Sequence, residues 1–343
     1  MGELVVHPID LAPFREGGPE DRAAVATAID VACRDTGFLV LTGHGVPQAT
    51  IDDWVERSTA FFERPMEEKR DYVVTEPSAN RGYTEPGKEG LAYTLGSRTP
   101  PDLFEAMTYG REDAIGPRFD AHRHHFRPNR WPDEPAGLRE AFLAYEAELR
   151  RVADDVLRAM AIALDLPEGW LVGRCAGSVI TTRAISYRRY PGSPDPEPGQ
   201  MRLGAHTDYG VLTLLWADDV PGLQVQRSGT WHDVSFAPRS FLGNIGDMLA
   251  MWTNDRWHST LHRVVPPPAS SNGPVRRRSV ARFLDGDPSV LVECIPSCCS
   301  ADNPARYAPV NAGEWLRTKI VGGRTLEVVE LPSSHRSADA HRP

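Results

Sequence analysis

The chain contains 343 residues, of which 41% are hydrophobic and 25% are charged, and these proportions are ordinary for a soluble globular protein. Its formal net charge of -9 argues against a general nucleic-acid-binding protein, which would show a basic face. No apolar stretch approaches the roughly 18 residues of a membrane span and the N-terminus has no signal-peptide pattern, so we expect a cytoplasmic protein without a membrane partner.

The N-terminal part of the chain is predicted to alternate short strands with two helices. A strand is expected at residues 5–9, a helix at 21–36 that ends at Gly37, a strand at 38–41 and a second helix at 47–63. Residues 73–101 are rich in Gly, Pro and Thr. A loop of this length inside a compact protein is usually functional, so we interpret it as a lid or rim.

The second half of the chain is predicted to be mainly strand, preceded by one long helix. Residues 134–164 carry apolar side chains at helical spacing and are expected to pack against a core. Strands dominate from residue 179, a short late helix is expected at 313–319, and residues 331–343 resemble a disordered tail. Because no internal repeat or domain-sized linker is evident, we expect one domain over residues 1–343.

The most informative motif is His206-x-Asp208, which is followed further along the chain by His262. Residues i and i+2 of an extended strand project to the same side, and both parts of the motif adjoin β-prone residues. Two neutral imidazoles and one carboxylate on one face of a metal leave three adjacent coordination positions open. This arrangement is expected of a non-haem Fe(II) centre that handles O2.

A second motif, Arg277-x-Ser279, lies in an alternating stretch that also places Ala281 and Phe283 on the same side. A guanidinium and a hydroxyl on one wall of a cavity form a fork for a carboxylate. The alternative is a solvated basic turn at residues 276–278, but such a turn would not explain the strand pattern that follows.

Two other clusters carry potential ligands. Cys294, Cys298 and Cys299 are candidates for a zinc site, but their spacing is not the paired form and no partner pair is evident. The cysteine total of five is odd and favours free thiols. The histidines at 122, 124 and 125 are interpreted as part of a solvated loop.

The two motifs resemble those of the isopenicillin N synthase-like group of Fe(II)/2-oxoglutarate-dependent oxygenases. The resemblance extends from about residue 4 to about residue 330 and includes Pro8-Ile-Asp10, Gly43-His-Gly-Val-Pro47, Pro101-Asp-Leu-Phe-Glu105 and Gly243-Asn-Ile-Gly-Asp247. It implies an α+β fold with a mainly β core: a double-stranded β-helix, or jelly roll, at residues 179–330. An N-terminal region at 1–112, flanking helices and a long supporting helix would surround this core.

The resemblance also implies roles for individual residues. His206, Asp208 and His262 match the family's iron ligands, and Arg277 and Ser279 match the pair that holds the distal carboxylate of 2-oxoglutarate. Tyr190 matches the tyrosine whose hydroxyl commonly meets this co-substrate. Ser186 and Arg188 depart from the usual pattern, which puts the co-substrate contacts in doubt or indicates an anionic substrate that pairs with Arg188 or Arg183.

The implied enzyme uses Fe(II), 2-oxoglutarate and O2 to hydroxylate, desaturate or cyclise a small molecule, amino-acid-like or a natural product, with release of succinate and CO2. We expect a monomer or weak homodimer that binds no nucleic acid. The substrate wall is predicted to contain Arg81, Tyr83, Phe104, Thr181, Arg183, Arg188, Leu223 and Phe283.

Three alternatives remain open at this point. An iron oxidase of the isopenicillin N synthase or aminocyclopropane carboxylate oxidase type would keep the ligands and dispense with 2-oxoglutarate. A catalytically silent binding module would not need the intact triad. A zinc hydrolase can use two histidines and a carboxylate, but it would not need the Arg-x-Ser fork.

Overall fold

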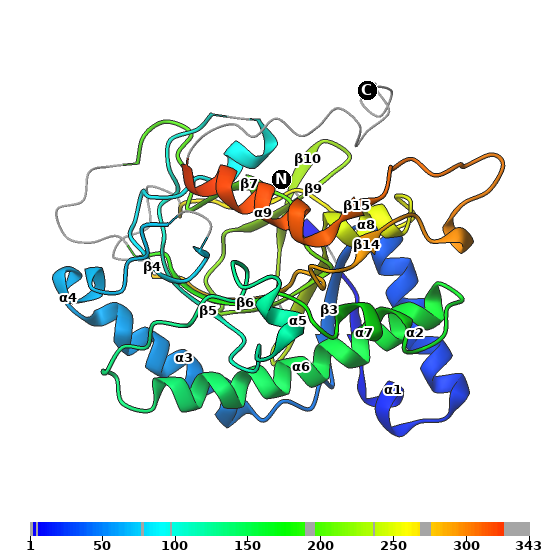
Figure 1. Cartoon of the computed structure of the whole chain (residues 1–343), viewed down its shortest axis with the longest axis horizontal. Helices are drawn as coiled ribbons and strands as arrows, with labels where there is room; N and C mark the ends of the chain where they lie inside the picture. The colour runs from blue at the N-terminus through cyan, green and yellow to red at the C-terminus, as the bar shows by residue number, and fades with distance from the viewer. Residues whose placement is uncertain are drawn as a thin grey trace.

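Two β-sheets pack face to face at the centre of the molecule, and helices cover the outer side of the larger one (Figure 1). The computed structural model describes residues 3–4, 6–76, 79–96, 98–188, 196–235, 237–267 and 276–325. The predicted tail at 331–343 lies outside these residues. Among them, no helix is both long and apolar enough to cross a membrane.

The larger sheet has the strand order β2-β3-β11-β8-β13-β6-β5-β4. In chain order these strands are β2 Pro8–Asp10, β3 Phe38–Thr42, β4 Gly82–Thr84, β5 Glu105–Gly110, β6 Ile180–Ser186, β8 Leu212–Ala217, β11 Phe241–Ile245 and β13 Arg278–Leu284. All of these neighbours pair antiparallel except β2 and β3, which are parallel.

The smaller sheet has the order β1-β10-β9-β12-β7. Its strands are β1 Glu3–Leu4, β7 Leu203–His206, β9 Leu223–Arg227, β10 Thr230–Val234 and β12 His262–Val264. A further pair, β14 Leu291–Val292 and β15 Val310–Asn311, lies apart from both sheets. The two opposed, mainly antiparallel sheets form the jelly roll expected from the sequence.

Strand alternation explains how the larger sheet separates two cores. On β3, Phe38 and Val40 belong to the cluster between the sheets, whereas Leu39 and Leu41 belong to the cluster beneath the helices. On β13, Val280 and Leu284 join the helix-side cluster. The alternation predicted for this strand is therefore present.

Helices α2, α3 and α6 pack against the outer side of the larger sheet, with α6 running along the molecule (Figure 1). The helices are α1 Ala12–Glu16, α2 Pro19–Asp35, α3 Gln48–Glu63, α4 Met66–Arg70, α5 Pro117–Asp120, α6 Leu138–Ala163, α7 Trp170–Cys175, α8 Asp247–Trp252 and α9 Ala312–Thr325, with 3-10 helices η2 Leu91–Leu95 and η3 Pro296–Cys298. Gly37 ends α2 at a φ of 71°, where a Cβ atom would lie 1.8 Å from the carbonyl oxygen of His258.

Two expectations about the elements need correction. Residues 73–101 are not one structureless loop, because they contain β4 and η2. The late helix is longer than predicted, since α9 continues to Thr325 instead of ending at residue 319. The C-terminal end of α9 contains Gly322 and Gly323, which lower helix propensity, so the sequence did not predict that the helix continues past residue 319.

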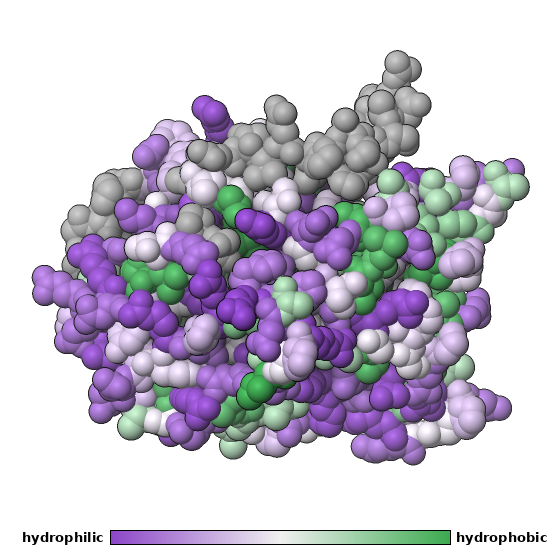
Figure 2. Space-filling model, in the orientation of Figure 1, coloured by the Kyte–Doolittle hydropathy of each residue, from purple (hydrophilic) through white to green (hydrophobic). Residues whose placement is uncertain are grey.

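The surface seen in Figure 2 is mostly hydrophilic, with hydrophobic side chains in small separate patches. The most exposed large apolar side chains come from separate elements: Val31, Leu95, Ile115, Leu143 and Leu291. Isolated residues of this kind are normal on a soluble protein and mark no binding surface.

Candidate active site and metal centre

The triad is assembled where two neighbouring strands of the smaller sheet meet a turn. His206 ends β7 and His262 begins β12, and the two residues pair directly across these antiparallel strands. Asp208 lies just beyond β7, in the connection to β8. Cross-strand pairing therefore brings His262 to His206, although many residues separate them in the sequence.

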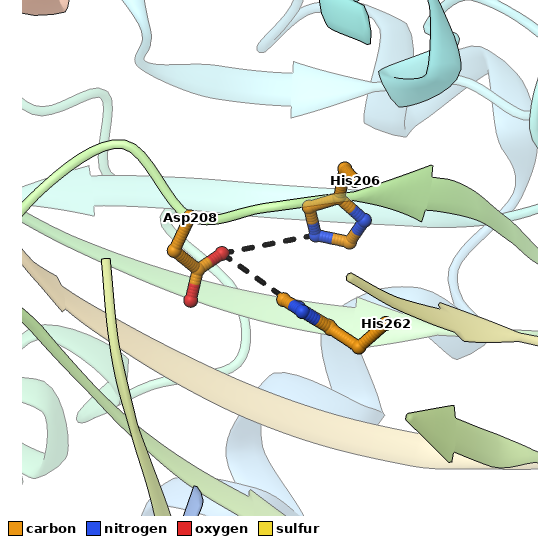
Figure 3. A group of neighbouring side chains, drawn as sticks. All are labelled: His206, Asp208 and His262. Atoms are coloured by element: carbon orange, nitrogen blue, oxygen red, sulfur yellow. Dashed lines mark ion pairs between the residues drawn. The ribbon is translucent and has the colours of Figure 1, made fainter. Parts of the chain in front are cut away.

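The three side chains point toward one another inside the barrel (Figure 3). The Nε2 atoms of His206 and His262 lie 3.7 and 3.8 Å from Oδ1 of Asp208, and one ligand atom from each residue lies within 4.8 Å of the others. All three residues are buried. The spacing suits a single metal ion bound by two nitrogens and one oxygen, and no other such group of His, Cys, Asp or Glu occurs in the described residues.

Backbone carbonyls orient both imidazoles. The Nδ1 atom of His206 lies 2.8 Å from the carbonyl oxygen of Gly204, and Nδ1 of His262 lies 3.1 Å from that of Thr260. A carbonyl only accepts, so each Nδ1 carries the proton and each Nε2 is left as a metal-binding lone pair. Burial, reinforced by His262, lowers the pKa of His206 and keeps its imidazole neutral.

The carboxylate of Asp208 is held in its ionised form. Its Oδ2 accepts hydrogen bonds from the Thr213 hydroxyl and, at 2.6 Å, from the Asn244 amide. Burial alone would raise the pKa of Asp208, but the two histidines and these hydrogen bonds outweigh it and hold the pKa below its usual value. Oδ1 is thereby directed toward the two imidazoles.

Arg277 and Ser279 form a second polar site between the sheets. Both are almost fully buried, and among the described residues Nε and Nη1 of Arg277 and Oγ of Ser279 have no hydrogen-bond partner. The Arg277 guanidinium lies 5.1 Å from the ring centre of Tyr187. A buried cation with unsatisfied donors is costly, and a carboxylate is the group that would satisfy it. The site therefore fits one end of a keto diacid.

Comparison with known proteins identifies the family. Residues 6–134 match the family described as non-haem dioxygenase in morphine synthesis N-terminal, and residues 181–286 match the 2OG-Fe(II) oxygenase superfamily. Validamycin A dioxygenase of Streptomyces hygroscopicus subsp. limoneus is 34% identical over 319 residues, covering 91% of this chain and 85% of that protein. This chain belongs to the 2-oxoglutarate and Fe(II)-dependent oxygenases.

Other relatives of this oxygenase agree. A 2-oxoglutarate-Fe(II) type oxidoreductase of Emericella nidulans is 31% identical, covering 90% of this chain and 87% of that one. The crystal structure of Neurospora crassa T7H in complex with alpha-KG superposes with a TM-score of 0.81 at 30% identity, covering 92% of this chain and 96% of that one. These names support a 2-oxoglutarate-dependent dioxygenase acting on a small molecule over the alternative of an iron oxidase that does not use this co-substrate.

An open pocket, called the cavity below, adjoins the triad of this oxygenase, with His206 and Asp208 in its wall. Its wall contains three of the residues predicted to contact substrate: Thr181 and Arg183 of β6, and Phe283 of the neighbouring strand β13, which pairs with Thr181. The remaining wall residues are Asn80, Glu89, Leu91, His206, Asp208, Tyr209, Asp285, Leu316, Ile320, Gly323 and Arg324. Asn80, Glu89 and Leu91 come from the segment predicted to form a lid or rim.

The structure places the other predicted substrate residues outside this wall. The Arg81 guanidinium donates to the backbone carbonyls of Asn80, His125 and Arg127, in space left by Gly110, where a Cβ atom would lie 1.8 Å from Nη2. The Tyr83 hydroxyl donates to Glu105 at 2.7 Å. Both side chains are turned toward the protein interior.

Three further predicted residues have partners outside the cavity wall or behind it. Arg188 pairs with Glu63 of α3, and Leu223 packs in the cluster between the sheets. Phe104 belongs to the same cluster and lies 4.9 Å below the Arg183 guanidinium, so it contacts a wall residue from behind. Tyr190, predicted to meet the co-substrate, lies outside the described residues.

Sequence reasoning missed Glu89 and Arg324, two charged residues of the cavity wall. Glu89 is buried and Arg324 is partly buried in the cavity wall that also contains His206 and Asp208. Neither residue lies in a recognisable motif, and the two come together only through the docking of α9. The histidine patch also needs correction, because His125 is buried and its pKa is lowered to about 4 by burial and neighbouring histidines. The five cysteines are free thiols, as predicted.

Proposed function

We propose that His206, Asp208 and His262 are the iron ligands of this oxygenase. The observation that carries the proposal is the convergence of three buried ligand atoms within 4.8 Å of one another. The hydrogen bonds on both Nδ1 atoms and on Oδ2 of Asp208 support it, because they leave one directed donor atom per residue.

Arg277 and Ser279 are proposed to hold the distal carboxylate of 2-oxoglutarate. The buried Nε and Nη1 donors of Arg277, which have no hydrogen-bond partner among the described residues, support this role, since a carboxylate on this guanidinium would accept from at least one of them. Bound iron and 2-oxoglutarate supply the oxidising chemistry with O2, with release of succinate and CO2. The chain's own residues position the co-substrate, keep the His206 imidazole neutral and exclude water from the metal. Tyr190 stays a predicted partner of the co-substrate.

The substrate is proposed to be a small amino-acid-like molecule or natural product, oxidised in the cavity lined by Thr181, Arg183 and Phe283. The cavity combines apolar surface with charged side chains, which suits a polar organic molecule better than a hydrocarbon. The name of the Streptomyces relative, a dioxygenase of validamycin A, supports a role in natural-product metabolism.

The test is anaerobic titration of the protein with Fe(II) and 2-oxoglutarate. The wild type should develop the visible charge-transfer band of a chelated keto acid, and His206→Ala should not. Arg277→Met should weaken 2-oxoglutarate binding about tenfold or more, because it removes charge-assisted hydrogen bonds. Arg278→Met is the matched control, since the Arg278 guanidinium forms an ion pair with Asp218 and is not part of the proposed co-substrate site. An Arg277→Met variant that binds 2-oxoglutarate as tightly as the control would contradict the assignment.

A further inference from the structure

Two arginines share one glutamate in the wall of the cavity. Nη2 of Arg183 lies 2.6 Å from Oε2 of Glu89, and Nε of Arg324 lies 3.2 Å from Oε1. The Thr84 hydroxyl donates to Oε1 as well, at 3.1 Å. The side chains of Arg183, Arg324 and Glu89 are 10%, 12% and 5% exposed, so the cluster is held away from bulk water.

This cluster carries one positive charge in excess. Burial lowers the pKa of the Arg324 guanidinium, Glu89 opposes the shift, and Arg183 adds to it by repulsion. An unbalanced buried charge is costly, and an anion bound in the cavity would offset it.

The neighbouring charges do not supply that anion. Asp208 of the cavity wall is a proposed iron ligand, and among the described residues no ion pair joins Asp285 to Arg183 or Arg324. Arg277, proposed to hold the co-substrate, is not part of the cavity wall. The excess positive charge of this cluster therefore lies in the wall of the cavity in which the substrate would bind.

The hydrogen bonds of the cluster favour an anion over a cation. Both carboxylate oxygens of Glu89 already accept a hydrogen bond, Oε2 from Arg183 and Oε1 from Thr84, and Oε1 also forms an ion pair with Arg324. A cationic group would therefore have to displace an arginine. In contrast, Nε of Arg183 has no hydrogen-bond partner among the described residues. One face of this guanidinium is covered by Phe104, which leaves the donors in its plane to meet a ligand.

Helix α9 adds an apolar approach to the cluster. Leu316, Ile320 and Arg324 are spaced by four residues on α9 and all line the cavity, together with Phe283 from the opposite wall. The backbone N–H of Gly90 donates to the carbonyl of Gly323 at 3.2 Å and ties the segment carrying Glu89 to this helix. The wall is thus apolar along α9 and cationic at its end.

We propose that the substrate of this oxygenase carries a carboxylate that binds between Arg183 and Arg324, with its less polar body along Leu316 and Ile320 of α9. This inference rests on the proposed function, because it places the oxidised part of the substrate beside the triad. Glu89 acts as the tether that holds the two guanidinium groups in position.

The test uses pairs of small monocarboxylic acids and their primary amides, with aliphatic or aromatic bodies, added to the anaerobic protein with Fe(II) and 2-oxoglutarate. Binding is followed by perturbation of the charge-transfer band. Acids that bind should do so about tenfold or more tightly than their amides, since the amide cannot accept two charge-assisted hydrogen bonds. If no acid of the panel binds better than its amide, the inference is overturned.

Variants locate the effect. Arg324→Gln and Arg183→Gln should each reduce the ratio of acid to amide affinity about tenfold, and Arg324→Lys should retain part of it. Glu89→Gln removes the negative charge of the cluster but keeps one carbonyl oxygen as an acceptor for an arginine, so the ratio should not fall. Arg227→Gln, which removes a surface guanidinium paired with Asp35, is the control.

The ratio of acid to amide affinity separates an effect on carboxylate binding from an effect on folding. A variant that is merely partly unfolded would bind both acids and amides less tightly, by the same factor. An unchanged ratio in both Arg183→Gln and Arg324→Gln would overturn the inference. Failure of the wild type to form the charge-transfer band at all would instead refute the proposed function.

Discussion

The carboxylate of Asp102 accepts a hydrogen bond from the backbone N–H of Gly204 at 2.9 Å. The carbonyl of Gly204 in turn faces Nδ1 of His206, and the second oxygen of Asp102 accepts from the N–H of Leu91 at 3.0 Å. One buried carboxylate thus joins η2, at the rim of the cavity, to the strand that carries a proposed iron ligand.

Asp102→Asn should weaken both connections. An asparagine offers one carbonyl oxygen, and its NH2 group would meet one of the two backbone N–H donors. We expect a loss of about 1–3 kcal/mol of unfolding free energy, typical of a buried donor left unsatisfied, and weaker Fe(II) binding. Urea denaturation and anaerobic iron titration measure the two effects. Asp133→Asn, at an exposed position, is the control, and equal behaviour of the two variants would contradict this role.

The same residue should leave a signature in the pH dependence of stability. Burial raises the pKa of Asp102 from 3.8 to about 7. When the pKa of a group is higher in the folded than in the unfolded state, the group stabilises the fold fully at any pH below its unfolded-state pKa. This stabilisation is lost as the pH rises through the folded-state pKa. Wild-type stability should therefore contain a component that falls between about pH 4 and pH 7 and is missing in Asp102→Asn. Urea midpoints over this range test it, and parallel profiles would refute it.

Removal of the hydrogen bonds on Asp208 should loosen the metal. Asn244→Ala deletes the amide that donates to Oδ2, which raises the pKa of Asp208 because that bond favours the ionised form. Partners of metal ligands typically contribute about 10–100-fold in metal affinity. We expect Fe(II) affinity to fall within this range, and binding on acidification to be lost at a higher pH than in the wild type. An unchanged affinity and pH profile would show that Asn244 acts only in the strand.

The sequence was sufficient where local pattern and local chemistry coincide. The strand at 38–41 was predicted within one residue, and the long helix was predicted from periodicity, with α6 starting four residues later and ending one residue earlier than expected. The triad was predicted from i, i+2 spacing, although Asp208 lies just beyond β7 and not within a strand. The turn after β7 still directs the side chains of both His206 and Asp208 to one point. Their proximity was therefore predicted correctly, although the two residues do not lie on one continuous strand.

The cavity wall shows where such reasoning ends. Arg183 is predictable because it belongs to an alternating strand, but Arg324 reaches the same site from the last turn of a helix whose glycines weaken its signal. Arg81 was expected in the wall and instead satisfies three backbone carbonyls, since Gly110 leaves room for its guanidinium. The direction of a long charged side chain depends on partners far away in the sequence, and no local pattern encodes them.

Arg282 provides a test of the layer between the larger sheet and α6. Its Nε lies 2.7 Å from Oε1 of Glu146 on α6, and the two side chains are 1% and 7% exposed. Arg282→Met leaves the Glu146 carboxylate buried with only the Thr182 hydroxyl as a donor among the described residues, so we expect a loss of about 3–5 kcal/mol of unfolding free energy. Urea denaturation measures this loss, and Arg127→Met, which breaks an ion pair exposed on both sides, should stay close to the wild type.

A double variant separates the buried charge from the lost contact area. Arg282→Met combined with Glu146→Leu removes both charges and keeps the volume similar, and replacement of a buried ion pair by apolar side chains is often neutral. The double variant should therefore be more stable than Arg282→Met alone. If it is less stable, the cost of Arg282→Met arises from lost packing between β13 and α6 and not from the uncompensated carboxylate.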